Sequence, residues 1–321
     1  MYLCYDPASL VALYNMVVVV IQGIDITDRC DIIKDKEKYQ NMYGERKCIM
    51  LVPAEIAQNC IQTARKKAEL SIPKMLLLSG MAGAFIALGA VAANVVSSTI
   101  ENAALAKLLA GCVFPVGLIM VLIAGSELFT GNCLMFAAVL HREIRLCDML
   151  KNWFFVYLGN FIGGFIVAAL VAYSGQFGFF DCAVAVTTIK AAAAKTSLSI
   201  VEALLRGVLC NILVCIAVWM SFSGTTVTEK VAAVFMPVMV FVLAGFEHSV
   251  ANMYYIPAGL FAMLNDTYAA AAAGIAGLDS LTIFGMLKNL FVVSVGNILG
   301  GAGIVALIYW FVYLKGTKRQ S

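Results

Sequence analysis

The chain has 321 residues, of which 62% are hydrophobic and 13% are charged, and this charged share is about half that of an average soluble domain. A formal net charge of +3 is too small to indicate a nucleic-acid-binding surface. Two histidines, and ten cysteines without a Cys-x-x-Cys pair, argue against a transition-metal site. We therefore predict an integral protein of the cell (plasma or inner) membrane, with no metal, no cofactor and no nucleic-acid partner.

Residues 1–49 mix charged residues with a short valine run and predict no recognisable element. We interpret them as an extension of unknown structure, either a disordered arm or a gene-model artefact in which Met50 is the true start. Residues 50–74 are predicted to form a cytoplasmic segment. Within it, residues 53–70 have the pattern of an amphipathic helix that lies on the membrane surface.

Residues 75–315 are predicted to form an all-α transporter domain with six membrane crossings, followed by a cytoplasmic tail at 316–321. Uncharged stretches of about 18 residues or more are candidate spanning helices. Five such stretches, and a sixth that is interrupted only by Glu247 and His248, occur at 75–96, 108–126, 152–180, 207–228, 289–314 and 231–265.

Two of these regions are too long for single helices. The second continues past Glu127 as far as residue 140, so that 108–140 and 231–265 would each be about 50 Å long as a helix. The hydrocarbon core of a bilayer is only about 30 Å thick. We therefore expect both helices to be broken, near 128–132 and near 247–251, with the two breaks facing each other across a pore.

Loop charges predict the orientation of the chain. With six crossings, most Lys and Arg residues fall on one side of the membrane: Arg65, Lys66, Lys67, Lys74, Arg142, Arg145, Lys151, Lys230, Lys315, Lys318 and Arg319. The opposite loops contain only Lys107, Lys190 and Lys195. We therefore predict that both termini are cytoplasmic.

An internal repeat links the two over-long regions. Residues 124–132 read AGSELFTGN and residues 244–252 read AGFEHSVAN, while the third and sixth crossings share the pattern G-N-x-x-G-G at 159–164 and 296–301. Two halves with three crossings each must have opposite orientations. Inverted repeats with interrupted helices are typical of transporters, whose sites lie at the breaks. The repeated asparagines Asn132 and Asn252, and Asn297 of the second pattern, are candidate supports for the breaks.

Ionisable residues inside apolar crossings are costly and are candidate functional residues. We expect Glu127 and Glu247, at equivalent repeat positions, to accept hydrogen bonds from free backbone amides where their helices break. His248 is different because Leu128 stands at its place in the first half. Imidazole titrates near neutral pH, so His248 is the candidate group for stabilising or protonating an anion at the membrane centre. Ordinary packing remains the alternative for each of these residues.

Further side chains complete the predicted pathway. Thr130, Asn211 and Asn297 are candidate hydrogen-bond donors, although Asn297 beside its glycines could equally serve helix packing. Phe114, Leu118 and Phe241 are candidates for closing the pore, with packing again as the alternative.

These motifs resemble the formate/nitrite transporter family from about residue 50 to residue 315. The resemblance is carried by AGSELFTGN at 124–132, LVCIAVWMSFSG at 213–224 and GFEHSVANMYYIP at 245–257. It implies an aquaporin-like fold in a homopentamer with a pore in each subunit. It also implies transport of formate, nitrite, hydrosulfide or lactate, often with a proton. The last motif is similar to the formate branch and the first to the nitrite and hydrosulfide branches, and we favour formate.

The resemblance also implies roles for single residues. His248 matches the family's central histidine and Thr130 its slit-loop threonine, preceded by Leu128 and Phe129. Lys195 matches a vestibule lysine, although its sequence alone favours a solvated loop charge. The constriction residues of the family match Phe114 and Leu118 on one side of the pore, and Phe241, Asn211 and Val214 on the other.

Alternatives within and outside the family are a nitrite or hydrosulfide channel, a water or glycerol channel, and a membrane enzyme. The Asn-Pro-Ala motif of water channels does not occur in the sequence. An enzyme would need a nucleophile and base or a metal cluster, and the sequence offers neither pattern. We therefore expect a transporter, not an enzyme, whose partners are small monovalent anions, protons, the lipid bilayer and other copies of the chain.

Overall fold

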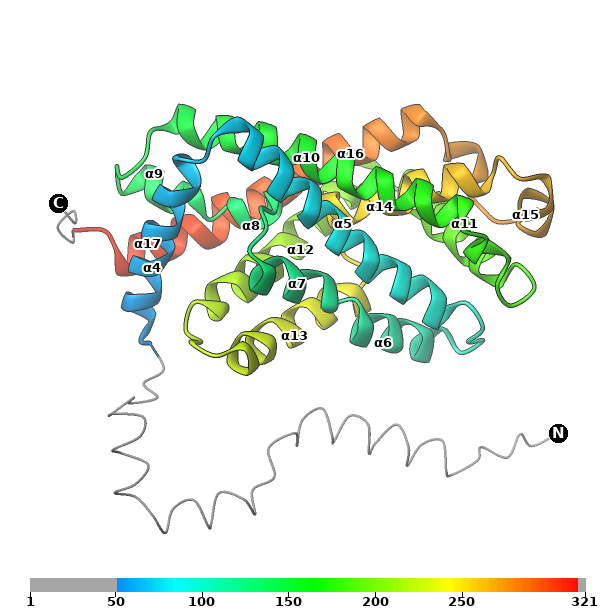
Figure 1. The fold of residues 1–321 in the computed structure, drawn as a ribbon, viewed down its shortest axis with the longest axis horizontal. Helices are drawn as coiled ribbons and strands as arrows, with labels where there is room; N and C mark the ends of the chain where they lie inside the picture. The colour runs from blue at the N-terminus through cyan, green and yellow to red at the C-terminus, as the bar shows by residue number, and fades with distance from the viewer. Residues whose placement is uncertain (1–50, 317–321) are drawn as a thin grey trace, which may run out of the picture. The chain divides into compact units, whose positions relative to one another are not determined.

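A computed structural model describes residues 51–316. The expectations for residues 1–49 and for the tail after residue 316 fall outside this range. The described part is helical, and its elements are drawn in Figure 1. In chain order they are α4 (Pro53–Ala68), α5 (Ile72–Ser97), α6 (Ala103–Val113), α7 (Val116–Ala124), α8 (Phe129–Asn132), α9 (Met135–Leu140), α10 (Leu146–Tyr173), the 3-10 helix η2 (Gln176–Gly178), α11 (Ala183–Thr196), α12 (Ile200–Ser221), α13 (Val227–Leu243), α14 (Ser249–Ala262), α15 (Asp266–Ala271), the 3-10 helix η3 (Leu278–Ser280), α16 (Ile283–Ile298), the π-helix η4 (Leu299–Ala306) and α17 (Leu307–Tyr313).

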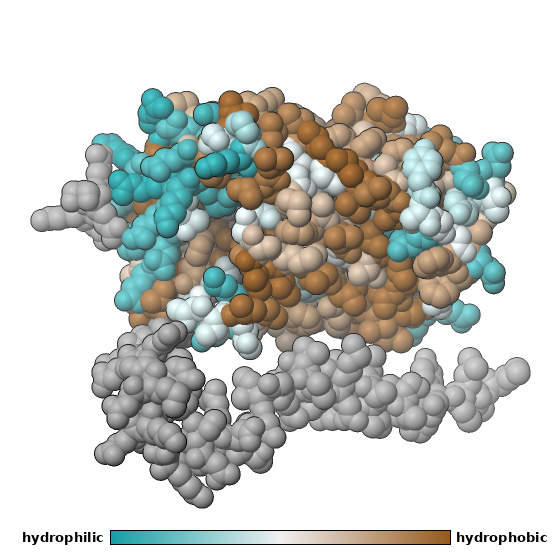
Figure 2. Space-filling model, in the orientation of Figure 1, coloured by the Kyte–Doolittle hydropathy of each residue, from teal (hydrophilic) through white to brown (hydrophobic). Residues whose placement is uncertain are grey.

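The described residues include five helical stretches that are long and apolar enough to cross a membrane, and the chain is a multi-pass membrane protein. These stretches are Ile72–Ser97, Ala103–Ala124, Leu146–Tyr173, Ile200–Ser221 and Ile283–Tyr313. Figure 2 shows hydrophilic residues gathered at the α4–α9 end and at the α11–α15 end of this view, with a largely hydrophobic surface between them. Such a surface suits a protein whose middle contacts lipid.

The region predicted as a sixth crossing, 231–265, does not form one helix. It is divided between α13, with 17 residues, and α14, with 14 residues. The division is the break expected from the length of the region. The break itself lies slightly earlier than predicted, because α13 ends at Leu243 and the left-handed Gly245, with φ of 69°, terminates it.

The break in the first half has the same cause. Helix α7 ends at Ala124, and Gly125 follows in the left-handed conformation with φ of 79°. Residues 126–128 are not helical, and the predicted break at 128–132 is largely occupied by the short helix α8. Both interruptions were thus predicted, and both lie a few residues nearer the N-terminus because glycine ends each helix.

Two elements near the ends of the molecule differ in how far they were expected. Helix α4 occupies most of the predicted amphipathic stretch at 53–70. Helix α11 was predicted as a loop, since it carries two lysines and is too short to span a bilayer. Its buried face packs against α14. Figure 1 shows α4 and α11 at opposite ends of the described part.

The repeated glycines lie where helices cross most closely. A Cβ atom added at Gly163 of α10 would collide with the Gly80 carbonyl of α5, and one added at Gly300 would collide with the Val208 carbonyl of α12. Glycine is therefore required in both copies of the G-N-x-x-G-G pattern, because it lets two backbones approach each other.

We predict that Gly300→Ala lowers the melting temperature of the detergent-solubilised protein and its folded yield, because the helix pair must separate. Overpacking of this kind costs about 1–3 kcal/mol. The matched control is Gly303→Ala in the same π-helix, since a Cβ there meets no atom within 4 Å. Equal melting temperatures for the two variants would contradict this explanation of the pattern.

Candidate functional site

The two helix breaks meet at the side chains of Thr130 and His248. The Thr130 Oγ1 and His248 Nε2 atoms are 2.8 Å apart, and both residues are buried. His248 also caps α14, because its Nδ1 accepts a hydrogen bond of 3.1 Å from the Ala251 amide. A neutral imidazole with an accepting Nδ1 carries its proton on Nε2. The ring therefore donates to Thr130, whose hydroxyl hydrogen remains available for another acceptor.

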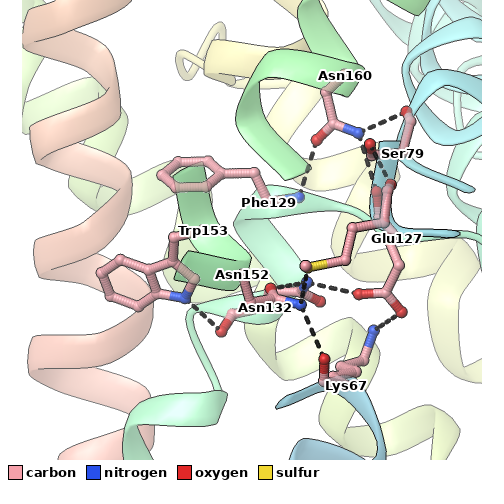
Figure 3. Close-up of polar contacts among 9 residues, drawn as sticks. Lys67, Ser79, Glu127, Phe129, Asn132, Asn152, Trp153 and Asn160 are labelled. Carbon is pink, nitrogen blue, oxygen red and sulfur yellow. Dashed lines mark hydrogen bonds and ion pairs between the residues drawn. The ribbon is translucent and has the colours of Figure 1, made fainter. Parts of the chain in front are cut away.

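In the first half, the broken backbone is held by Asn160 of α10 (Figure 3). Its Oδ1 accepts from the Phe129 amide at 2.9 Å, at the start of α8. Its Nδ2 donates to the carbonyl oxygens of Ser79 and Glu127, at 2.8 and 2.9 Å. One buried side chain thus satisfies three backbone groups that water cannot reach.

Asn297 of α16 does the same in the second half. Its Oδ1 accepts from the Ser249 amide at 2.9 Å, and its Nδ2 donates to the carbonyls of Gly207 and Glu247 at 2.8 and 3.0 Å. The expectation that Glu127 and Glu247 accept these amides was wrong. Asparagines serve this purpose because a primary amide can accept and donate at once, whereas an ionised carboxylate only accepts.

The Glu127 carboxylate instead joins an ion pair with Lys67 of α4, at an Nζ–Oε1 distance of 2.6 Å. Its other oxygen accepts from Asn132 Nδ2 at 2.7 Å. Asn132 also donates to Asn152 Oδ1 at 2.8 Å, and Asn152 donates back to the Lys67 carbonyl at 3.2 Å. Figure 3 shows this closed ring of four polar residues below the Asn160 contacts.

The second half repeats the ring. Lys195 of α11 pairs with Glu247 at 3.0 Å, Asn252 donates to the same carboxylate at 2.6 Å, and Asn289 accepts from Asn252 at 2.8 Å. Asn289 then donates to the Lys195 carbonyl at 2.8 Å. Lys195 was expected in a vestibule. Its side chain is 16% exposed, and its ammonium also lies 5.1 Å from the centre of the Tyr255 ring.

Asn211 of α12 is buried beside Thr130, but its amide hydrogens are already used. They are donated to the backbone carbonyls of Thr130 and Asn297, at 3.2 and 2.7 Å. The Oδ1 atom of Asn211 has no hydrogen-bond partner among the described residues. In this structure Asn211 therefore supports the Thr130 segment, where the sequence predicted a direct contact with an anion. Val214, on the same helix, is also buried.

A cavity of about 330 Å³ opens at the α4 end of the described part. Lys67 and Glu127 line it together with Leu118 and Leu128. Leu128 and Gly131, which lie on either side of Thr130 in the sequence, also line this cavity. The cavity therefore ends next to the contact between Thr130 and His248.

Two aromatic rings lie beside His248. The rings of Phe114 and Phe241 contact each other edge to face with centroids 5.6 Å apart, and Phe241 is 5.9 Å from the imidazole. The assignment of Phe114 and Leu118 to one side and Phe241 to the other was therefore wrong for Phe114. Helices α6 and α13 pack together, which brings the two phenylalanines face to face.

Phe129, predicted at the constriction with Leu128, does not line the cavity. Its ring packs edge-on against Trp153 and Tyr157 of α10, with centroids 6.1 and 5.0 Å apart. Trp153 also donates from its indole nitrogen to the Asn132 carbonyl at 2.9 Å. Phe129 thus anchors α8 on α10, as Figure 3 shows for its contact with Trp153.

Comparisons with known proteins agree with this architecture. The family model described as formate/nitrite transporter matches residues 54–311. The chain is 40% identical over 263 residues to the formate channel FocA of Haemophilus influenzae, covering 79% of this chain and 92% of the relative. It is 37% identical over 281 residues to a probable formate transporter of Methanothermobacter thermautotrophicus, covering 82% and 97%. A solved structure titled pentameric formate channel with formate bound superposes with a TM-score of 0.68 and 33% identity, covering 76% of this chain and 98% of that one.

We predict that the Lys67–Glu127 pair contributes to stability and not only to charge. Glu127→Gln should lower the melting temperature markedly, because losing one partner of a buried ion pair typically costs about 3–5 kcal/mol, and somewhat less here since 22% of the Lys67 side chain is exposed. The double variant Lys67→Met/Glu127→Gln should lose less than the sum of the single variants.

The control for this prediction is the surface pair Arg145–Asp148, whose side chains are 79% and 27% exposed. Asp148→Asn should change stability by less than about 1 kcal/mol. If Glu127→Gln and Asp148→Asn shift the melting temperature equally, the Lys67–Glu127 pair has no special structural role.

Proposed function

The chain belongs to the formate/nitrite transporter family, and from this premise we propose that it carries formate across the membrane through a pore in each protomer of a homopentamer. The observation that supports this most directly is the buried contact between Thr130 and His248 where the two broken helices meet. A polar pair at the meeting point of two breaks is the arrangement expected of a transporter site. Two relatives and one solved neighbour carry formate in their names.

The proposed architecture is an aquaporin-like bundle of two inverted three-helix repeats with both termini in the cytoplasm. Support comes from the duplicated network, because the ring around Glu127 recurs around Glu247. Helices α4 and α11, which supply the two lysines, lie at opposite ends of the described part (Figure 1). Residues 75–315 then form the transporter domain, with the segment 50–74 on its cytoplasmic side.

In the proposed pathway, Lys195 attracts the anion at the α11 end, and Lys67 does so at the α4 end. Each ammonium is paired with a glutamate, so its attraction for an anion acts at short range and is screened by salt. Leu118 and Leu128 on the cavity side, and the Phe114–Phe241 ring pair beside His248, limit the water around the central contact.

At the centre, the hydroxyl of Thr130 donates to a formate oxygen while His248 donates to Thr130. A bare anion in an apolar interior would cost tens of kcal/mol on a Born estimate, so transfer of a proton from the imidazole lowers the barrier. The proton passes from His248 to the formate oxygen and gives neutral formic acid. Water then reprotonates the ring. No covalent bond to carbon forms or breaks, which is a transport step and not enzymatic catalysis.

We predict that reconstituted wild-type protein carries formate and that His248→Asn changes the pH dependence of this flux between about pH 5 and pH 8. Asparagine retains a cap for α14 but does not titrate in this range. Flux of formate, nitrite, hydrosulfide and lactate would be measured in proteoliposomes across a pH series. Thr130→Ser serves as the control that keeps the hydroxyl.

An unchanged pH profile and unchanged proton coupling in His248→Asn would limit His248 to a structural role. A wild-type protein that transports nitrite or hydrosulfide and not formate would reject the substrate. Swelling of the proteoliposomes in glycerol would instead favour a neutral-solute channel.

A further inference from the structure

The backbone carbonyl of Thr130 receives two side-chain hydrogen bonds from α12. Asn211 Nδ2 donates to it at 3.2 Å and Cys215 Sγ at 3.4 Å. All three residues have 0% exposure. Asn211 and Cys215 are one helical turn apart and therefore lie on the same face of α12. A thiol is a weak donor, but here it is directed at the residue that contacts His248.

These two donors are absent from the equivalent helix of the first half. The carbonyls of Ser79 in α5 and Gly207 in α12 are equivalent, because each accepts from the asparagine that holds the break in its own half. One turn after Gly207 comes Asn211, and two turns after it comes Cys215. The residues one and two turns after Ser79 are Gly83 and Ala87, which have no polar side chain.

The other departures from the repeat meet at the same place. His248 stands where the first half has Leu128, and Thr130 stands where the second half has Val250. The repeated groups hold the broken backbones in both halves, so they form the frame. The groups that are not repeated all gather around Thr130. This separation indicates a task beyond holding the fold.

We propose that Cys215, together with Asn211, is a positioning residue that fixes the orientation of Thr130 toward His248 and toward the transported anion. This inference rests on the proposed function. Helix α8 has only four residues, so its own hydrogen bonds do little to fix its rotation. Two donors on the Thr130 carbonyl hold the backbone, and with it the direction of the hydroxyl.

The π-helix η4 supports this assignment from the other side of α12. A Cβ atom added at Gly301 would collide with the Asn211 amide and lie 2.7 Å from Cys215 Sγ. The equivalent Gly164 of the first half faces the Met253 backbone carbonyl instead, at 3.2 Å. Gly301 thus leaves the space that the two donors occupy. Short π-helical segments are frequent at functional sites.

The test compares Cys215→Ala with Cys215→Ser and with Cys210→Ala in reconstituted full-length protein. Cys210 is buried on the same helix, and no hydrogen bond from its thiol is found within residues 51–316. Its alanine variant therefore creates a similar cavity without touching Thr130. Maximum rate, half-saturating concentration and pH profile of formate flux would be measured per folded protein, beside the melting temperature.

We expect Cys215→Ala to lower the maximum formate rate about threefold or more, the effect of losing one hydrogen bond, and to alter the pH profile. Cys215→Ser should stay within about twofold of wild type, because it keeps a donor. Cys210→Ala should lower only the melting temperature. In a Thr130→Val background, Cys215→Ala should have no further effect on flux, since both act through the same hydroxyl.

If Cys215→Ala retains the wild-type rate and pH profile while wild type transports formate, the positioning role is wrong and the proposed function stands. The same conclusion follows if Cys210→Ala changes flux as much as Cys215→Ala. If wild type transports no formate, the proposed function fails and this inference fails with it. Should Cys215→Ala not assemble, Cys215→Val removes the donor without leaving a cavity, and the same outcomes apply.

Discussion

Two helices break within the apolar part of this protein, and each break frees backbone groups that water cannot satisfy. An unpaired amide or carbonyl in such surroundings costs several kcal/mol. Asn160 and Asn297 meet this requirement with one acceptor and two donors each. Because their partners lie on a neighbouring helix as well as on the break, each asparagine also fixes how α5 and α10, or α12 and α16, are placed around the broken segment. The lysine–glutamate rings and the glycine crossings then build on this arrangement.

The duplicated frame explains why the functional chemistry can be confined to a few residues. A symmetric scaffold supports both breaks with the same residue types, so a change on one side leaves the backbone in place. His248 replaces the leucine of the first half without loss of the cap, since its Nδ1 takes the Ala251 amide. Its second nitrogen is thereby directed at Thr130. The stability of the break and the polarity of the centre are supplied by different atoms of one side chain.

The sequence was sufficient for features that depend on length and local pattern. The over-long regions predicted both breaks, and the repeat predicted that Glu127 and Glu247 do the same job. It was not sufficient for partners that come from distant elements: Lys67 lies on α4 and Lys195 on α11, and no spacing connects them to the glutamates. Helix α11 was missed because its alanines and lysines resemble a loop between crossings. The direction of the Phe129 ring depends on the surface that α10 presents, which local pattern does not encode.

The pairing of both lysines has a consequence for conduction in the proposed pathway. A lone ammonium in a poorly hydrated vestibule would bind an anion tightly and release it slowly, whereas passage requires binding that is favourable enough for entry and weak enough for exit. Glu127 and Glu247 reduce the attraction of their lysines, and the ion pairs hold each ammonium at a defined place. Between the two pairs, the anion meets hydrogen-bond donors and apolar rings. The charge is then best stabilised at the ends and least stabilised at the centre, where Thr130 and His248 stand. A proton-transferring side chain is useful at that position and would be of little use at either end.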